Sequence, residues 1–397
     1  MAEIDRLIRE LLETAARSDD PADLINLACN GMIGLGLPLR RLSVGIQTLD
    51  PTIRAVSYVW LRSIGLTRLT TPHVPGPDGD LPYRLSPIYA LVQDGLTQRH
   101  WRLDRGEGCA ELPLLQELRG EGATSYFMHI VRFGGEIAAA VPGVAIAIAT
   151  DRPGGFTDGD LSLFVALMPA MGLASCRYML ARVSSSILGV YLGDRTARRV
   201  LAGEVRRGTG RAIEAAILLA DLRGFTSLAG REPSARVVAW LDQHLEAIGE
   251  AVAANDGEVL KFLGDGLLAV FPVEDEIDDG EACRRALAAA EQALAATAEL
   301  NARRRAAGEP ELGLDLVLHF GEVVYGNVGA ARRLDFTVIG PTVNEASRIE
   351  ALCGELGRPL LLSETFATRC GRTTTNLGRF ALRGCAGETE VHELPPP

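Results

Sequence analysis

The order of the apolar segments in residues 215–394 is the feature that most restricts how this chain can fold. A continuous apolar run at Ala215–Ala220 indicates a buried strand, and helical spacing follows from about residue 233 to 255. Two apolar runs on either side of Gly264-Asp265-Gly266 then predict a hairpin. The later elements that we expect are an alanine-rich helix at 281–307, strands at 312–320 and 336–339, a helix at 342–353 and a short strand at 360–362. An order of strand, helix, strand, strand, helix and strand is typical of the ferredoxin-like α+β fold.

Residues 1–160 combine short apolar runs with turn signals, which predicts a separate α/β domain. We expect strands at Leu42–Thr48, Val56–Leu61, Ser125–Phe133 and Val144–Thr150. The segment between about residues 62 and 124 is rich in Pro, Gly and charged residues, so it predicts loops with short helices.

Between these two parts, helical spacing extends from about Asp158 to Gly203, with an interruption at Pro169. The apolar stripe predicts a buried face or a dimer seam. Gly189 and Gly193 weaken a helix, so the pattern leaves open whether it is continuous or broken. The expected organisation is a domain at 1–160, a helical linker and dimerisation segment at 161–209, and a second domain at 210–397.

The formal net charge of −11 argues against a protein that coats nucleic acid, although a nucleotide needs only a few local cations.

The first residues are acidic, which does not fit a secretory signal. Two apolar stretches, Ile137–Thr150 and Leu161–Cys176, each contain a Pro and are too short to cross a bilayer. The seven Cys form no CxxC pair. We therefore expect a cytoplasmic protein with no membrane span.

Two carboxylates follow predicted strands. Asp221 comes directly after the apolar run that ends at Ala220, and Asp265 lies at the tip of the hairpin. Each has an ordinary alternative, because Asp can cap a turn and Asp-Gly is a common hairpin turn. If both lie at one end of the sheet, their mutual repulsion requires a cation, and Mg²⁺ is the natural candidate. The amides near Gly224 and Phe225 could approach phosphate oxygens closely.

A third group of polar residues follows the strand expected at 336–339. Thr342 and Glu345 form a capping box at the start of a helix. Asn344 and Arg348 are four residues apart and therefore share one helix face. An amide and a guanidinium on one face suit a ribose and a phosphoryl group in transfer, although a solvated helix face has the same pattern.

Residues 210–395 resemble the catalytic domain of class III nucleotidyl cyclases. Four segments match in identity, order and spacing: LADLRGFT, KFLGDGLLAVF, FGEVVYGNVG and DFTVIGPTVNEASRIE. The resemblance implies a homodimeric adenylate cyclase that converts ATP to 3′,5′-cyclic AMP and pyrophosphate. It also implies two Mg²⁺ or Mn²⁺ ions in each active site, with the sites shared between subunits.

The resemblance assigns roles to individual residues. It implies that Asp221, Leu222 and Asp265 bind the metal ions, and that Asn344 and Arg348 are catalytic. The substrate-binding residues that it implies are Gly224, Phe225, Lys261, Thr337 and Arg383. In the family, the metal-binding aspartates come from one subunit. The base-selecting and catalytic residues come from the other.

Lys261 and Thr337 occupy the two base-selecting positions. Lys can donate to an adenine ring nitrogen, and Thr can accept from the exocyclic amine. Guanylate cyclases of this family usually carry Glu and a small residue such as Cys there, so the pair favours ATP over GTP. Thr337 stands where Asp is common, as in a subgroup of which some members respond to bicarbonate; such a response stays open here. Arg383 resembles a residue that contacts the triphosphate, with a surface arginine as the alternative.

The end of the first domain, from Ala145 to Thr157 with the apolar helix after it, resembles the close of a GAF domain. This resemblance implies a sensor for an unidentified small-molecule effector that acts through the helical segment. Three alternatives remain for the whole chain: a catalytically weak nucleotide-binding regulatory module, a guanylate cyclase, and a cyclic dinucleotide synthase. The last is disfavoured because the hairpin lacks a GGDEF-type signature.

Overall fold

The computed structural model describes residues 2–48, 53–74, 81–134, 142–206, 208, 210–274, 276–330, 333–384 and 387–395. The chain divides into two compact units, Met1–Ile187 and Leu188–Pro397, which we call the N-terminal unit and the C-terminal unit. Each unit has its own buried cores.

The N-terminal unit is built on a six-stranded sheet in which each paired strand is antiparallel to its neighbour. The strand order is β3-β2-β1-β6-β5-β4. The strands are β1 (Arg41–Gln47), β2 (Ile53–Leu61), β3 (Gly65–Pro72), β4 (Gln98–Arg102), β5 (Ser125–Arg132) and β6 (Gly143–Thr150).

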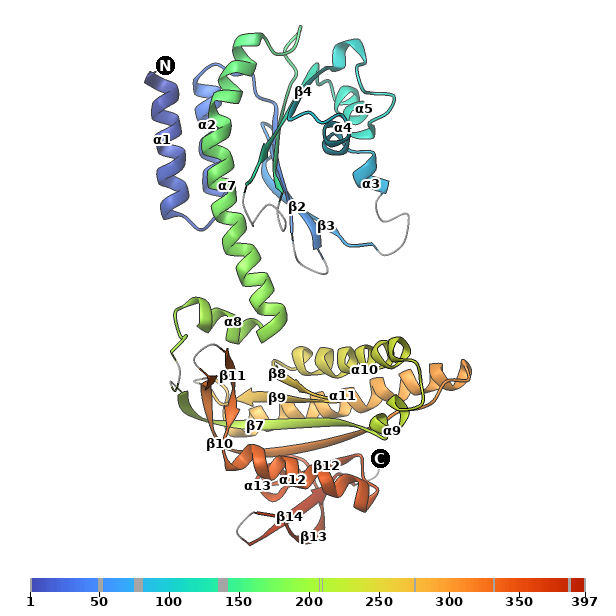
Figure 1. Ribbon diagram of the computed structural model, residues 1–397. Helices are drawn as coiled ribbons and strands as arrows, with labels where there is room; N and C mark the ends of the chain where they lie inside the picture. The colour runs from blue at the N-terminus through green and yellow to red at the C-terminus, as the bar shows by residue number, and fades with distance from the viewer. Residues whose placement is uncertain are drawn as a thin grey trace. The chain divides into compact units, whose positions relative to one another are not determined.

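Helices cover both faces of this sheet (Figure 1). Residues of α1, α2 and α7 pack with β1, β2 and β6 in one apolar core, whereas residues of α4 and α5 pack with β4, β5 and β6 in another. The helices are α1 (Ala2–Arg17), α2 (Pro21–Gly34), α3 (Leu81–Arg84), α4 (Pro87–Gln93), the 3₁₀ helix η1 (Leu103–Arg105), α5 (Pro113–Gly120) and α7 (Asp158–Leu192).

The four strands expected in this unit are confirmed as β1, β2, β5 and β6. The segment at 62–124 contains its short helices, but it also contains β3 and β4. Both are edge strands of the sheet, and most residues of β3 are exposed, which explains why they lack a strong apolar pattern. Helices α1 and α2 were not predicted, although each buries an apolar face in the core.

Helix α7 passes through Pro169 without a break in the helical assignment and ends at Leu192. The interruption comes at Gly193, whose φ of 81° begins α8 (Asp194–Leu201). Because the N-terminal unit extends to Ile187, most of the expected linker at 161–209 belongs to that unit. By length and composition α7 could cross a membrane, but 56% of its most apolar window is buried within the fold. In the other apolar stretch, Ile137–Thr150, residues Gly143–Thr150 form β6. Residues 137–141 lie outside the described residues.

The C-terminal unit is built on an eight-stranded sheet with the order β13-β14-β12-β10-β7-β9-β8, and β11 pairs with β10. The four strands β10-β7-β9-β8 are antiparallel neighbours in the ferredoxin-like order, so that expectation is confirmed. The strands are β7 (Gly210–Arg223), β8 (Glu258–Leu263), β9 (Gly266–Pro272), β10 (Gly313–Ala330), β11 (Arg333–Ile339), β12 (Leu360–Ser363), β13 (Thr375–Ala381) and β14 (Glu388–Glu393).

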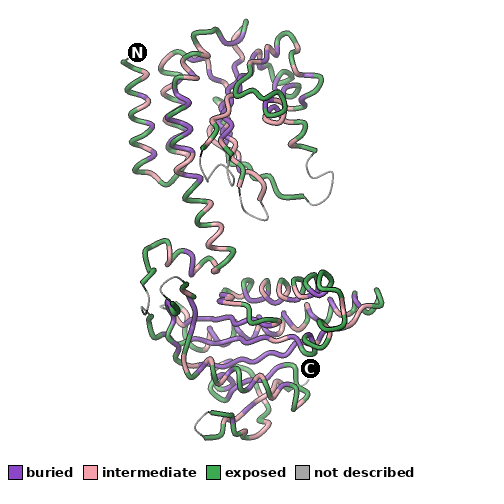
Figure 2. The backbone as a smooth tube through the Cα atoms, in the orientation of Figure 1, coloured by how far each residue is buried: buried purple, intermediate pink, exposed green. Residues whose placement is uncertain are grey.

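Alternation along β7 and β10 gives the sheet two apolar faces, and the middle of each of these strands is buried (Figure 2). Residues of α10 and α11 pack on one face, and α12 packs on the other. The helices are α8, α9 (Phe225–Ala229), α10 (Ser234–Ala254), α11 (Asp279–Ala306), α12 (Pro341–Leu356) and α13 (Glu364–Ala367). The elements that the sequence did not predict are α9, α13, β13 and β14.

Candidate active site

The tip of the β8–β9 hairpin lies against the end of β7. Ala220 of β7 pairs with Leu267 of β9, so the next residues along, Asp221 and Gly266, approach each other. A Cβ atom built on Gly266 would lie 2.2 Å from the carbonyl oxygen of Ala220 and 3.0 Å from Oδ1 of Asp221. This close contact requires glycine, and it places the turn that contains Asp265 beside Asp221.

The environment of Asp221 disfavours a negative charge. Burial, together with the charges of Asp265 and Asp315, raises the pKa of Asp221 to about 6. A backbone hydrogen bond from Leu222 opposes this rise. The predicted approach of Asp221 and Asp265 is therefore present within a single chain.

Asp315 is a further acidic residue of this site, and we did not predict it. It pairs directly with Asp221 across β7 and β10, and it is only 5% exposed. Arg223 donates hydrogen bonds from Nε to Oδ2, at 3.0 Å, and from Nη2 to Oδ1 of Asp315. One sequence feature could have identified Asp315: it is the single acidic residue in the apolar run Leu312–Phe320. A buried acidic residue is usually paired with a specific partner.

Glu350 of α12 is the fourth carboxylate. Burial and the charges of three aspartates, first Asp221, then Asp315 and Asp265, raise the pKa of Glu350. Ile349, the residue before it, is buried against the α12 face of the sheet, which holds Glu350 close to that sheet. The sequence offered little to single it out, because Glu is common on exposed helix faces.

Among the described residues, the guanidinium that is hydrogen-bonded to one of these four carboxylates is that of Arg223, so the cluster carries an excess of negative charge. Within the described ranges, no three His, Cys, Asp or Glu side chains converge closely enough to enclose a metal ion. Hard oxygen donors with unbalanced charge fit Mg²⁺, which commonly takes one or two protein carboxylates and completes its shell with water and substrate phosphates. Asp221 and Asp265 fit such a partly open site.

The two predicted base-selecting residues lie on neighbouring strands. Lys261 is a half-buried residue of β8, next to an irregularity in the pairing with β9. Thr337 is 3% exposed on β11, and β11 contacts β8. Lys261 forms no ion pair in the part of the chain that the structure describes, so its ammonium group is available to a ligand.

Asn344 and Arg348 lie on an exposed face of α12. Neither makes a hydrogen bond or ion pair with any other described side chain, and Arg348 is not among the charges that shift the pKa of Asp221. Glu350 thus turns toward its own chain's aspartates, whereas the predicted catalytic pair faces outward. The single chain does not bring the two groups together.

The remaining predicted residues contribute mainly backbone atoms. The side chains of Leu222 and Phe225 are buried in the core under α10 and α11, so only their backbone groups can reach a ligand. Gly224 has a φ of 79°, a conformation that favours glycine, and it precedes the short helix α9. Arg383 is exposed after the end of β13.

Residues 210–394 match the protein family described as Adenylate and Guanylate cyclase catalytic domain. Adenylate cyclase 1 of Rhizobium meliloti (strain 1021) is 38% identical over 186 residues, which cover 46% of this chain and 27% of that protein. The adenylate cyclase of Anabaena cylindrica is 34% identical over 152 residues, which cover 38% of this chain and 29% of that protein. The crystal structure of the adenylyl cyclase CyaB from P. aeruginosa matches with a TM-score of 0.44 and 21% identity, over 48% of this chain and 97% of that one.

Residues 210–394 are a class III nucleotidyl cyclase catalytic domain. This cyclase domain holds the acidic cluster, the predicted base-selecting pair and the exposed face of α12. The chain spans less than a third of the length of the two curated relatives, at 27% and 29%.

Proposed function

We propose that this chain is an adenylate cyclase that forms 3′,5′-cyclic AMP and pyrophosphate from ATP, at sites that two copies of the chain share. The proposal rests on one observation: the acidic cluster and the predicted catalytic pair lie apart in the single chain. The acidic cluster around Asp221 lies at the end of β7, whereas Asn344 and Arg348 are exposed on α12, and their side chains have no partner among the described residues. A second copy can supply the missing half of each site.

In the proposed reaction, the ribose 3′ hydroxyl releases its proton to water and its oxygen bonds to the α-phosphorus, while the bond from the α-phosphorus to the α–β bridging oxygen breaks and pyrophosphate leaves. Divalent cations, when bound, would lower the pKa of that hydroxyl and neutralise the triphosphate. Asp221 and Asp265 would hold these cations. Asn344 orients the ribose, and the guanidinium of Arg348 donates hydrogen bonds to the phosphoryl oxygens as negative charge develops on them.

The choice of ATP rests on Lys261 and Thr337. The ammonium of Lys261 donates to a ring nitrogen of adenine, and the buried hydroxyl of Thr337 accepts from the exocyclic amine. Guanine presents an N–H donor where adenine has its ring nitrogen, and the ammonium of Lys261 can only donate, so the two donors would face each other without an acceptor. In support, the two curated relatives described above are named adenylate cyclases.

The test of the reaction is the formation of cyclic nucleotide by the full chain with Mg²⁺ or Mn²⁺ and either ATP or GTP. We expect cyclic AMP from ATP and at least tenfold lower turnover of GTP. The double variant Lys261→Glu/Thr337→Cys should reverse this preference. If the wild-type chain prefers GTP, the chain is a guanylate cyclase; if it binds nucleotide without turnover of either, it is a regulatory module.

The test of the shared sites is a mixture of two inactive variants. Asp221→Ala and Arg348→Ala should each lower kcat by about 100-fold or more. In an equal mixture, half of the dimers are mixed, and each mixed dimer has one intact site. The mixture should therefore recover about a quarter of wild-type activity. No recovery from variants that fold and associate would show that each site lies within one chain.

We also propose that the N-terminal unit is a GAF-like sensor that regulates the cyclase domain. Its six-stranded antiparallel sheet with helices on both faces supports this proposal. Continuity of α7 past Ile187, the end of that unit, gives a covalent route for a change in the sensor to reach the cyclase domain. Removal of residues 1–187 should abolish any response to an effector, measured as cyclic AMP formation.

A further inference from the structure

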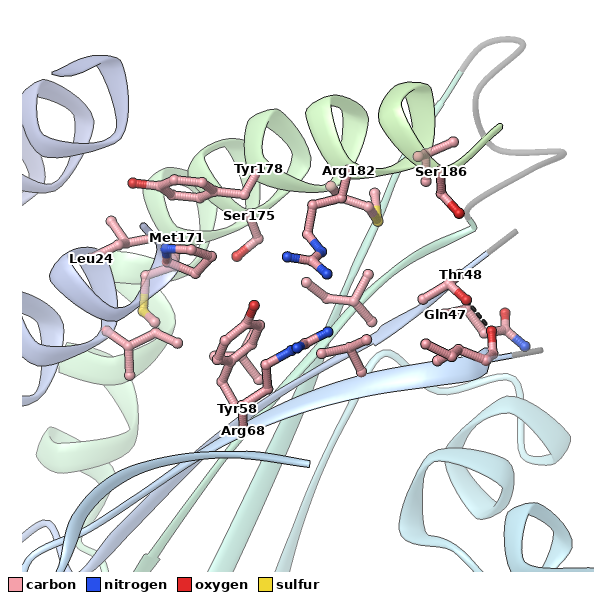
Figure 3. A pocket seen from close by; sticks show the side chains of 18 residues that line it. Leu24, Gln47, Thr48, Tyr58, Arg68, Met171, Ser175, Tyr178, Arg182 and Ser186 are labelled. Atoms are coloured by element: carbon pink, nitrogen blue, oxygen red, sulfur yellow. Dashed lines mark hydrogen bonds between the residues drawn. The ribbon is translucent and has the colours of Figure 1, made fainter. Parts of the chain in front are cut away.

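The N-terminal unit contains a cavity between α7 and the face of the sheet that α1 and α2 also cover (Figure 3). Its atom-free space is about 830 Å³, including open solvent at the mouth. The described residues that line it come from α2, β1, β2, β3, α7 and the ends of neighbouring loops. All the residues that line the cavity belong to the N-terminal unit, Met1–Ile187.

The floor of the cavity is apolar. Leu24 of α2, Val44 of β1, Val56 of β2 and Met171 of α7 line it, and each is at most 4% exposed. Such a surface has no hydrogen bonds to offer water, so an apolar group that replaces water there is favoured.

One side of the cavity is polar and positively charged. Tyr58 and Arg68 are directly paired across β2 and β3, so their side chains leave the same face of the sheet. Ser175 and Arg182 are about two turns apart on α7 and line the cavity from the opposite side. In Figure 3 the two hydroxyls and the two guanidinium groups point toward the same region of the cavity.

These four side chains have unused hydrogen-bonding capacity. Arg68 and Arg182 are exposed at the mouth, and neither forms an ion pair with any described carboxylate. This contrasts with Arg62 and Arg177 of the same unit, which pair with aspartates. The described lining includes no Asp or Glu, so the positive charge of the cavity is not balanced from within it.

We propose that this cavity binds an organic carboxylate with an apolar body. The apolar body packs on the floor formed by Leu24, Val44, Val56 and Met171. The carboxylate accepts hydrogen bonds from Arg68 and Arg182 at the mouth and from the hydroxyls of Tyr58 and Ser175. A neutral apolar molecule would leave the guanidinium groups without a partner, and a small hydrophilic anion would leave the floor empty.

Binding would involve α7 over several turns, because Met171, Ser175, Arg182 and Ser186 all line the cavity. The inference does not depend on the cyclase activity, because it concerns a separate unit and is tested by binding alone. Failure of the nucleotide assays would therefore leave it intact, and its own failure would leave the proposed reaction intact.

The experiment is calorimetric titration of the full chain with three probes: decanoate, decanol and acetate. Decanoate combines the two features that the cavity recognises, decanol keeps the apolar chain without the charge, and acetate keeps the charge without the chain. We expect decanoate to bind at least tenfold more tightly than decanol, and acetate to give no measurable binding. No decanoate binding, or equal affinity for decanol, would overturn the proposal.

Variants locate the site. Arg68→Gln and Arg182→Gln should each weaken decanoate binding about tenfold and leave decanol binding within twofold. Both residues are exposed, so we expect folding to be retained, and circular dichroism checks this. Arg9→Gln, on the exposed face of α1 and outside the cavity, is the matched control and should bind like the wild-type chain.

A fourth variant, Ser175→Ala, removes the hydroxyl without adding any atom and should weaken decanoate binding by a smaller factor, about threefold. Wild-type affinity for decanoate in both arginine variants would overturn the assignment. So would an equal loss of decanoate affinity in Arg9→Gln.

Discussion

At the scale of single residues, the negative charge around Asp221 is only partly compensated. Asp265, Asp315 and Glu350 lie near it, and Arg223 is committed to Asp315 by two hydrogen bonds. The folded chain therefore holds carboxylates together at a cost in free energy, which a bound cation would relieve.

Because of this cost, the stability of the folded chain depends on pH in a predictable direction. The pKa of Asp221 rises from 3.8 to about 6 on folding, so the folded chain binds more protons than the unfolded chain between these values. Stability therefore falls as the pH rises through this window. In the presence of a chelator, Asp221→Asn should be more stable than the wild-type chain at pH 8 by about 1–2 kcal/mol, allowing for solvent screening.

Urea denaturation at pH 8 and pH 4 measures this difference, which should shrink at the lower pH. Mg²⁺ should then raise the midpoint of thermal unfolding of the wild-type chain more than that of Asp221→Asn. Equal stability of the two proteins at pH 8 without metal would contradict the account.

The ion pair between Arg223 and Asp315 predicts a second effect at this scale. Arg223→Gln leaves the buried carboxylate of Asp315 without its charged partner, beside other acids, and should destabilise the chain by about 2–3 kcal/mol. Arg305→Gln is a matched control, because Arg305 also pairs bidentately, with Glu311, but in an exposed position. Arg305→Gln should lower the free energy of unfolding by less than about 1 kcal/mol. Chemical denaturation compares the two, and similar costs would contradict the prediction.

At the scale of elements, the position of the β8–β9 hairpin depends on the absence of a side chain at Gly266. A Cβ atom there would lie 2.2 Å from a backbone oxygen of β7, and a backbone atom cannot rotate away. The hairpin would have to move, and Asp265 would move with it. The element thus controls the distance between the two metal-binding candidates.

Gly266→Ala should therefore destabilise the chain by about 3 kcal/mol and lower cyclase activity in the fraction that still folds. Gly249→Ala in α10 is the control, because its Cβ would meet no atom within 4 Å. It should stabilise the chain by about 0.5–1 kcal/mol. Urea midpoints and kcat give both readouts, and a neutral effect of Gly266→Ala on both would rule out this packing.

At the scale of the whole molecule, the chain has two units with separate apolar cores. Because α1, α2 and the first turns of α7 bury their apolar residues within the N-terminal unit, that unit does not need the cyclase domain to cover its core. The fragment of residues 1–187 should therefore fold by itself. A cooperative urea transition with a near-ultraviolet circular dichroism signal would confirm this, and a fragment without fixed tertiary structure would contradict it.

The sequence by itself determined the core of the cyclase domain, because apolar runs and their order encode buried strands and helices directly. It also placed Asp221 and Asp265 at strand ends, since such positions follow from the strands themselves. It did not reveal α1, α2 or the edge strands β3 and β4. The apolar residues of these segments form patterns too weak to identify a helix or a strand from the segment alone.

Only the tertiary structure decided which charges meet. Asp315 and Glu350 are 94 and 129 residues from Asp221 along the chain, and they reach it through the pairing of β10 with β7 and the packing of α12. The cavity beside α7 likewise combines Arg68 from a weakly patterned edge strand with Arg182 from a helix. Local patterns report what each segment buries, whereas contacts between distant segments depend on strand register and helix packing, which no local pattern specifies.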